Sequence, residues 1–247
     1  MNKGDAKAGS LFAVDLKRML TGKLFYIMLG ISAALPVLII VMTTAAGSAE
    51  EEMFTSAWQA IGSLGSGMSM DLTSMCNINL IFFLAAVFAC LFTADDFKSG
   101  YCKNIFAIRA KKADYVFSKI MVSFITGALM LTAYFAGALA GSKIVGLSFA
   151  MEGFSVWNLV MCMISKIFIM AIFAAIYVLM GVIAKRHAWL SILLSFTVGM
   201  FMFMVIPMMT PLTSGIMNAV MCLAGGVIFT AAIGCAGKMV LNRTDLI

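Results

Sequence analysis

Long apolar stretches alternate along the chain with short polar breaks. Six stretches of about 20 residues or more are almost free of charge: 24–46, 73–94, 115–140, 158–184, 189–207 and 216–237. A helix needs about 20 apolar residues to cross the hydrocarbon core of a bilayer, because every backbone amide there must be bonded within the segment. The pattern therefore predicts an all-α integral membrane protein with six transmembrane helices.

Little of the chain remains for a soluble domain. Of its 247 residues, 63% are hydrophobic and 11% are charged, and the mean hydropathy is +1.05. We therefore expect a single transmembrane domain over residues 1–247, with an extracellular loop at 47–72. The first apolar stretch begins only at residue 24 and is longer than the core of a secretory signal, so we expect no cleavage there.

Residues 1–23 form a polar lead-in that contains an amphipathic pattern. In "SLFAVDLKRML" one face of a helix holds Phe12, Leu16, Met19 and Leu20, and the other holds Asp15, Lys17 and Arg18. This spacing predicts a helix that lies flat on the inner membrane surface, with its charged face toward water.

The distribution of basic residues predicts the orientation. Of the 17 Lys and Arg residues, all except Lys143 and Lys166 fall in the segments on one side of the six stretches. Lys and Arg accumulate on the cytoplasmic side of membrane proteins, so both termini are expected in the cytoplasm. The net charge of +6 then reflects topology and contact with anionic lipid, not nucleic acid.

Lys166 is the one basic residue well inside an apolar stretch. An intramembrane charge is a functional candidate, because removing it from water is costly. The stretch around Lys166 is longer than a span requires, and Trp157 would anchor its first part at the outer interface. We therefore expect the Lys166 side chain to reach the outer interface.

Two further features concern helix packing. Pro36 cannot donate a backbone hydrogen bond and is expected to bend the first span near its middle. Small residues recur at four-residue intervals, Gly137 and Gly141 in the third span and Gly226, Thr230 and Gly234 in the sixth. Such intervals allow helices to approach closely, and packing within one chain is the expected use.

Catalytic and cofactor motifs are missing from the sequence. It has no G-x4-GK[ST] nucleotide loop and no CxxC pair, and His187 is its single histidine. We therefore expect no enzyme activity, no metal and no bound cofactor. No Asp or Glu occurs in the middle of an apolar stretch, although self-sufficient carriers usually place carboxylates there. An ATP-independent channel or secondary carrier remains the alternative, ahead of a membrane-embedded enzyme.

The charged segment "DDFKSGYCKNIFAIRAKKADYVFSK", residues 95–119, separates the second and third stretches. Gly100 permits a sharp reversal, and Ile105, Phe106 and Ile108 form an apolar knob between Lys103 and Arg109. That arrangement is typical of a short helix that docks into a groove of another protein. Asp114 is expected to cap the next helix, with Tyr115 at the headgroup level. Alternatively, the basic residues only set the topology and contact anionic lipid.

This segment resembles the loop between the second and third spans of bacterial type 2 ABC transporter permeases. The resemblance lies in the pattern D-x3-G-x2-KN-x4-R-x5-Y-x2-SK, which places Asp96, Gly100, Lys103, Asn104, Arg109, Tyr115, Ser118 and Lys119. The tail "NRTDLI" also resembles the basic ending of that family. One departure is the pair Ala107 and Ile108, because many members have a Pro shortly before the Arg.

The resemblance implies a permease of the bacterial cytoplasmic membrane that pairs with a second permease, identical or related. A separate ATPase would bind ATP and Mg and dock on a cytoplasmic coupling loop, residues 95–114, and on the start of the next helix. The implied docking and coupling residues are Asp96, Gly100, Lys103, Asn104, Ile105, Phe106, Ile108, Arg109, Tyr115 and Lys119. Relatives of this size commonly export hydrophobic or amphipathic peptides, such as toxins or antimicrobial peptides, or drugs. Spans rich in Met and Phe suit such cargo, although contact with lipid and packing in the core are the more common uses of these residues.

Overall fold

The computed structural model describes residues 5–46, 54, 56–64, 77–107, 111–203 and 205–243. Nearly all of these residues are helical, and the sole β-bridge in these ranges joins Ser56 to Ser148. Within these ranges, five helices are long and apolar enough to cross a membrane: α2 (Lys23–Ala46), α4 (Leu80–Lys98), α6 (Lys112–Val145), α7 (Val156–Ala184) and α10 (Ile216–Arg243). The predicted all-α integral membrane class is therefore confirmed.

The fifth predicted stretch, 189–207, forms two shorter helices. These are α8 (Ala188–Phe203), which is apolar but has only 16 residues, and α9 (Val205–Met209). Pro207 lies inside α9, where its ring restricts the backbone and its nitrogen cannot donate. Six membrane crossings therefore remain a prediction, to which the structure contributes five long helices and the shorter α8.

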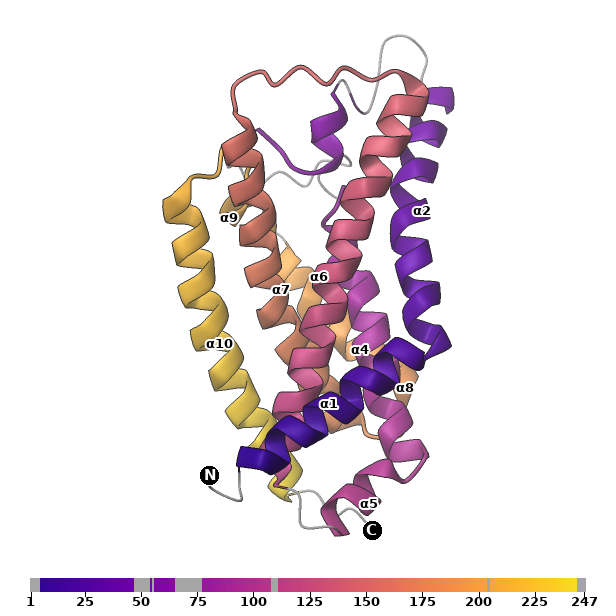
Figure 1. Ribbon diagram of the computed structural model, residues 1–247, viewed down its shortest axis with the longest axis vertical. Coiled ribbons are helices and arrows are strands. Elements are labelled where there is room, and N and C mark those ends of the chain that lie inside the picture. The colour runs from indigo at the N-terminus through magenta and orange to yellow at the C-terminus, as the bar shows by residue number, and fades with distance from the viewer. Residues whose placement is uncertain are drawn as a thin grey trace.

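The long helices run side by side, and shorter elements mark the two ends of the bundle (Figure 1). Helix α1 (Asp5–Thr21) crosses one end obliquely, and α5 (Tyr101–Ala107) lies at that same end. The 3-10 helix η1 (Ala57–Ala60) and the connection from α6 to α7 lie at the other end. The distribution of basic residues predicts that the end with α1 and α5 is the cytoplasmic one.

Helices α4, α6 and α7 contribute most of the buried residues, whereas α2 and α10 lie at the periphery. Helix α2 packs mainly along α6, and α10 packs mainly along α7. Both peripheral helices expose large apolar side chains, among them Met42 on α2 and Phe229 on α10. Such surfaces suit a hydrocarbon environment, as expected for helices that contact lipid or a second permease.

Small residues allow two of these helix pairs to approach closely. A Cβ atom on Gly137 would overlap the carbonyl oxygen of Ala33 on α2, and Gly141 contacts α2 one turn further along. A Cβ on Gly226 would come within 2.9 Å of the carbonyl oxygen of Phe168 on α7. The seams thus join helices of the same chain, as predicted.

Pro36 lies inside α2 and does not end that helix. The nearby Ser32 hydroxyl donates to the carbonyl oxygen of Met28 at 2.8 Å, one turn earlier. Pro36 packs against α6 at Gly137. This contact with α6 supports the part of α2 that lacks the backbone hydrogen bond that a proline cannot donate.

Candidate functional site

A cluster of buried charges joins α1, α4 and α6 at the end of the bundle that carries α5. Lys119 Nζ donates to Asp15 Oδ1 at 2.9 Å and lies 2.6 Å from Asp96 Oδ2. Arg18 Nη1 donates to Asp96 Oδ1 at 2.8 Å. The side chains of Asp15, Asp96 and Lys119 are completely buried, and that of Arg18 is 28% exposed. Two buried carboxylates are therefore matched by two cations.

Three hydroxyl groups supply the remaining hydrogen bonds of the two carboxylates. The Tyr115 hydroxyl donates to Asp96 Oδ2 at 3.0 Å. Ser118 Oγ and the Tyr101 hydroxyl donate to the two oxygens of Asp15, at 2.6 Å and 3.2 Å. A buried ion pair is stable only when its other lone pairs are also satisfied. These donors, which come from α5 and α6, fulfil that condition.

Aromatic rings cover the two cations of the cluster. The guanidinium carbon of Arg18 lies 4.0 Å from the centre of the Tyr101 ring. Lys119 Nζ lies 4.2 Å from the centre of the Phe92 ring. The negative faces of such rings attract cations, most strongly where water is excluded. The arrangement therefore ties the first turn of α5, through Tyr101, to the cluster.

The contribution of α1 differs from the prediction. Asp15 was expected on a water-facing side with Lys17 and Arg18, but its side chain is fully buried, whereas Lys17 is exposed. The reason is tertiary, since α1 packs against α6 and finds Ser118 and Lys119 there as donors. Sequence analysis missed Asp15 as a site residue because nothing in the pattern of α1 indicates a partner 104 residues away.

The predicted docking residues divide into two groups. Asp96, Tyr115 and Lys119 lie in the buried cluster, and the side chain of each is completely buried. Tyr115, which was expected at the headgroup level, has a fully buried ring, and its hydroxyl donates to Asp96. The expected cap at Asp114 is also displaced. Helix α6 begins at Lys112, so Asp114 lies in its first turn.

The second group lies on and beside α5. Gly100 makes the predicted reversal, with a φ of 75° that a glycine adopts without strain. Lys103 and Asn104 are exposed, whereas Ile105 is 9% exposed and faces the interior of the chain. Phe106 is half-buried, and its ring packs edge-on against Tyr115 at a centroid distance of 5.6 Å.

The predicted apolar knob is therefore not a protrusion in its described part. Ile105 and Phe106 turn inward because α5 has its own apolar core to cover, formed by Cys102, Tyr115 and Val116. The outward face of α5 is polar instead. Ile108 and Arg109, also predicted as docking residues, lie outside the residues that the structure describes, as do residues 244–247 of the tail.

Groups around the cluster keep their protons at neutral pH. Burial raises the pKa of the Cys102 thiol to about 12. Burial, together with the Asp15 carboxylate, raises the pKa of Tyr101 to about 12. Burial alone would lower the pKa of Arg18, but the Asp96 carboxylate raises it above its ordinary value. The cluster thus holds fixed charges and neutral donors, which suits it to connect helices and not to activate a nucleophile.

A second buried cation lies near the opposite end of the bundle. Lys166 Nζ on α7 donates to Asn79 Oδ1 and Thr210 Oγ1, both at 2.9 Å. The side chain is completely buried, so the predicted extension to the outer interface is wrong. Its two acceptors are contributed by the residue just before α4 and the residue just after α9. In the described part of the chain no carboxylate lies within ion-pair distance of Lys166.

No metal centre accompanies either cluster. Among the residues with described positions, no group of three His, Cys, Asp or Glu side chains is placed to hold a metal ion. The predicted site residues with described positions thus fall in the ionic cluster, around the buried Lys166 and on the exposed face of α5.

Comparison with known proteins supports the predicted resemblance to ABC transporter permeases. A family model described as ABC-2 family transporter protein matches residues 16–202, from α1 into α8. No curated protein and no solved structure matches the chain. The family match covers α5 and the membrane helices up to α8, about three quarters of the chain, and it includes the residues of the ionic cluster except Asp15. The protein is therefore a multi-pass protein of the cytoplasmic membrane and belongs to the ABC-2 transporter family, as a permease subunit of an ABC transporter.

Proposed function

We propose that this permease is the membrane subunit of an ATP-driven exporter. Two permeases, identical or related, form the translocation pathway, and a separate ATPase binds ATP and Mg on the cytoplasmic side. The ATPase docks on the exposed face of α5, and its movement on ATP binding changes access to the pathway. The exported cargo is a hydrophobic or amphipathic peptide, such as a toxin or antimicrobial peptide, or a drug.

The connection between α5 and the ionic cluster carries this proposal. On one side α5 exposes Lys103 and Asn104 to solvent. On the other it is fixed by the Tyr101 hydroxyl, which donates to Asp15, and by Ile105 in the apolar core. Closely packed interiors transmit displacement because they deform little. A force on α5 would therefore move α1, α4 and α6 together.

The character of the membrane helices supports the choice of cargo. The chain contains 23 Met and 20 Phe residues, flexible and aromatic side chains that adapt to apolar ligands of varied shape. No membrane helix in the described residues carries a buried carboxylate outside the cytoplasmic cluster, so nothing there favours a cationic metal cargo.

The experiment compares two charge reversals with the same chemistry. Lys103→Glu changes the exposed face of α5, and Lys143→Glu changes an exposed residue near the other end of α6. Each variant is expressed with a candidate ATPase, purified, and tested for retained ATPase and for cargo-stimulated ATP hydrolysis. Lys103→Glu should reduce both several-fold, because charges at the rim of an interface govern association. Lys143→Glu should change neither.

Two results would overturn the proposal. In the first, Lys103→Glu retains full ATPase association and coupled hydrolysis, which would exclude α5 as the docking element. In the second, the purified permease alone, reconstituted in vesicles without an ATPase, accumulates cargo against its gradient. That result would identify a secondary carrier.

A further inference from the structure

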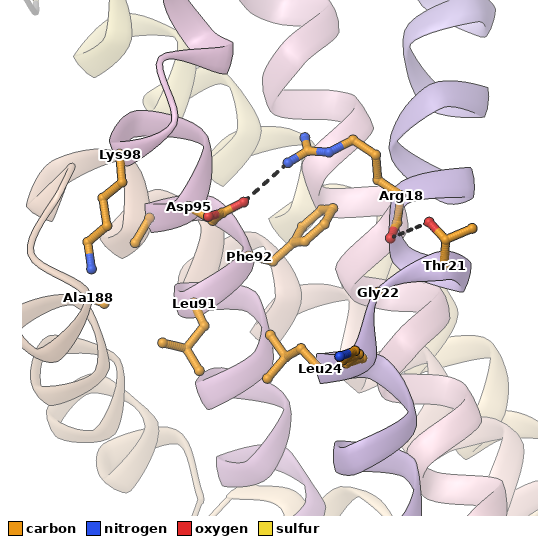
Figure 2. Close-up of a pocket in the computed structure, with 11 residues that line it drawn as sticks. Arg18, Thr21, Gly22, Leu24, Leu91, Phe92, Asp95, Lys98 and Ala188 are labelled. Carbon is orange, nitrogen blue, oxygen red and sulfur yellow. Dashed lines mark hydrogen bonds and ion pairs between the residues drawn. The ribbon is translucent and has the colours of Figure 1, made fainter.

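A cavity of about 610 Å³ lies at the cytoplasmic corner where α1 turns into α2. Its wall is formed by Arg18 and residues 21–24 of this corner, by Ala188 at the start of α8, and by five residues near the end of α4, namely Leu91, Phe92, Ala94, Asp95 and Lys98. Figure 2 shows Arg18 and Lys98 on opposite sides of Phe92 and Asp95. We propose that this cavity binds the phosphate headgroup of an anionic phospholipid from the inner leaflet.

The charges of the wall favour an anion. Arg18, Lys23 and Lys98 line the cavity, and Asp95 is the single carboxylate among the lining residues. Arg18 is already paired with Asp95 and Asp96. Lys23 and Lys98 are exposed, and neither makes an ion pair within the described residues. Two unpaired ammonium groups therefore remain to contact a phosphate.

The backbone adds to this positive potential. Helix α2 begins at Lys23, in the cavity wall, and has no acidic residue in its first turn. The first amides of a helix have no partner within it, and the helix dipole places partial positive charge there. The start of α2 thus reinforces the two lysines.

The apolar part of the wall distinguishes a lipid from a soluble anion. Leu24, Leu91 and Phe92 line the cavity beside the basic residues. A free phosphate gains nothing from such a surface, whereas the glycerol and upper acyl chains of a phospholipid would cover it. Next to the wall residue Ala188, Trp189 is 68% exposed, and tryptophans of membrane proteins favour the headgroup level. The wall therefore matches an amphipathic ligand at the inner interface.

The site would also communicate with the ionic cluster. Arg18 Nη2 lies 3.4 Å from Asp95 Oδ2, a contact at the cavity, while Nη1 of the same guanidinium holds the buried Asp96. A phosphate in the cavity would compete with Asp95 for Nη2 and leave Nη1 in place. Lipid occupancy would therefore be sensed by the guanidinium that helps to fix α1 to α4.

The test measures lipid retention by the purified full chain. The protein is reconstituted in nanodiscs of phosphatidylcholine with an increasing fraction of phosphatidylglycerol, released into detergent, and its bound lipids are counted by native mass spectrometry. The wild-type chain should retain phosphatidylglycerol in preference to phosphatidylcholine. Lys23→Gln with Lys98→Gln should weaken this retention by roughly thirty-fold, since each interfacial cation contributes about a fivefold preference. A control with equal charge change, Lys111→Gln with Lys238→Gln, should retain the lipid.

Two further arms separate the sources of the phosphate and guard against a folding defect. Asp95→Asn removes the one opposing carboxylate and should strengthen retention of phosphatidylglycerol, a gain that a misfolded variant cannot produce. An excess of inorganic phosphate should leave the lipid bound. The lipid assignment is overturned if phosphate displaces the lipid, if the two lipids are retained equally, or if the control pair loses as much as the cavity pair.

Discussion

Lys119 Nζ lies 2.6 Å from Asp96 Oδ2, and both side chains are completely buried. The two residues close the loop that carries α5, because Asp96 lies near the end of α4 and Lys119 near the start of α6. The ion pair therefore holds both ends of the proposed docking loop together. Asp15 bonds the same ammonium from α1, so three helices share one contact.

Asp96→Asn should destabilise the protein far more than Asp95→Asn. Loss of the Asp96 carboxylate leaves the buried Lys119 with one counterion, and breaking a buried pair in this way costs about 3–5 kcal/mol. Asp95 is 66% exposed, and its pair with Arg18 should contribute about 1 kcal/mol or less. The free energies of unfolding in detergent are the measurement. Equal losses for these neighbouring residues would show that the cluster does not hold the helices.

Gly137→Ala should destabilise the bundle, although alanine is the better helix former. A Cβ at this position would overlap the Ala33 carbonyl of α2, so the two helices would have to separate. Gly30→Ala is the matched control, because a Cβ there meets no other atom within 4 Å. The control should be neutral or raise stability by about 0.5–1 kcal/mol. Thermal unfolding in detergent compares the two. Unchanged stability in Gly137→Ala would contradict the close packing of α2 on α6.

Cys102 should react slowly with a membrane-impermeant maleimide, and Asn104→Cys should react rapidly from the cytoplasmic side alone. Cys102 is buried and Asn104 is exposed on the same helix. The thiolate is the reactive form, and burial raises the pKa of Cys102 from 9.0 to about 12. Its labelling rate should therefore rise with pH until about 12, whereas that of Asn104→Cys should level off above about 9. Each is measured in a chain whose other cysteines are replaced by Ala.

The same shift predicts a loss of stability in alkali. The folded chain holds the Cys102 thiol protonated above its ordinary pKa of 9.0, so its contribution is complete below pH 9.0 and is lost as the pH approaches about 12. Cys102→Ser should reduce this slope, measured as unfolding free energy against pH.

For the labelling experiment, one result would contradict the burial of Cys102. If Cys102 reacted at pH 7 as fast as Asn104→Cys, the apolar core beneath α5 would be open to solvent.

Thr210→Val should cost more stability than Lys166→Met. Thr210 Oγ1 accepts from Lys166 Nζ at 2.9 Å, so its removal leaves a buried ammonium with one acceptor fewer. Leaving a buried donor unsatisfied costs about 1–3 kcal/mol, and more when it is charged. Lys166→Met removes the charge with its demand for acceptors and is therefore the milder change. Chemical unfolding in detergent compares the two variants. A larger loss in Lys166→Met would show that the ammonium itself stabilises the bundle.

The local hydropathy pattern predicted where the membrane helices lie, but it predicted their first and last residues less accurately. The stretch 24–46 agrees with α2 (Lys23–Ala46), because an apolar run between charges has few other solutions in a membrane. The stretch 73–94 begins before α4 (Leu80–Lys98), since hydropathy alone did not detect that Asn77 and Asn79 precede the helix. At its other end α4 extends past the predicted limit through Asp95 and Asp96. Both carboxylates are paired with Arg18 of α1, and the local sequence of α4 gives no indication of this partner.

The candidate site was predictable in part. Asp96, Ser118 and Lys119 belong to the motif that the sequence shares with the permease family, and the structure places all three in the ionic cluster. Asp15 was assigned to the water-facing side of α1, and Ile105 to an outward knob. Both assignments relied on the amphipathic pattern, which predicts which face of a helix contacts water and which contacts lipid. The pattern does not predict contact with a neighbouring helix. Such a helix can supply hydrogen-bond donors to a carboxylate or an apolar core to an isoleucine.

The sequence by itself determined the membrane class and the family, because hydropathy and motif spacing act along the chain, and its charge asymmetry predicts which side is cytoplasmic. Only the tertiary structure decided which charges are buried and which partners they have. A carboxylate such as Asp15 and an ammonium such as Lys166 can leave water when oxygens or cations from distant segments meet them at about 3 Å. These contacts depend on how the helices pack, so they cannot be predicted from a local stretch of sequence.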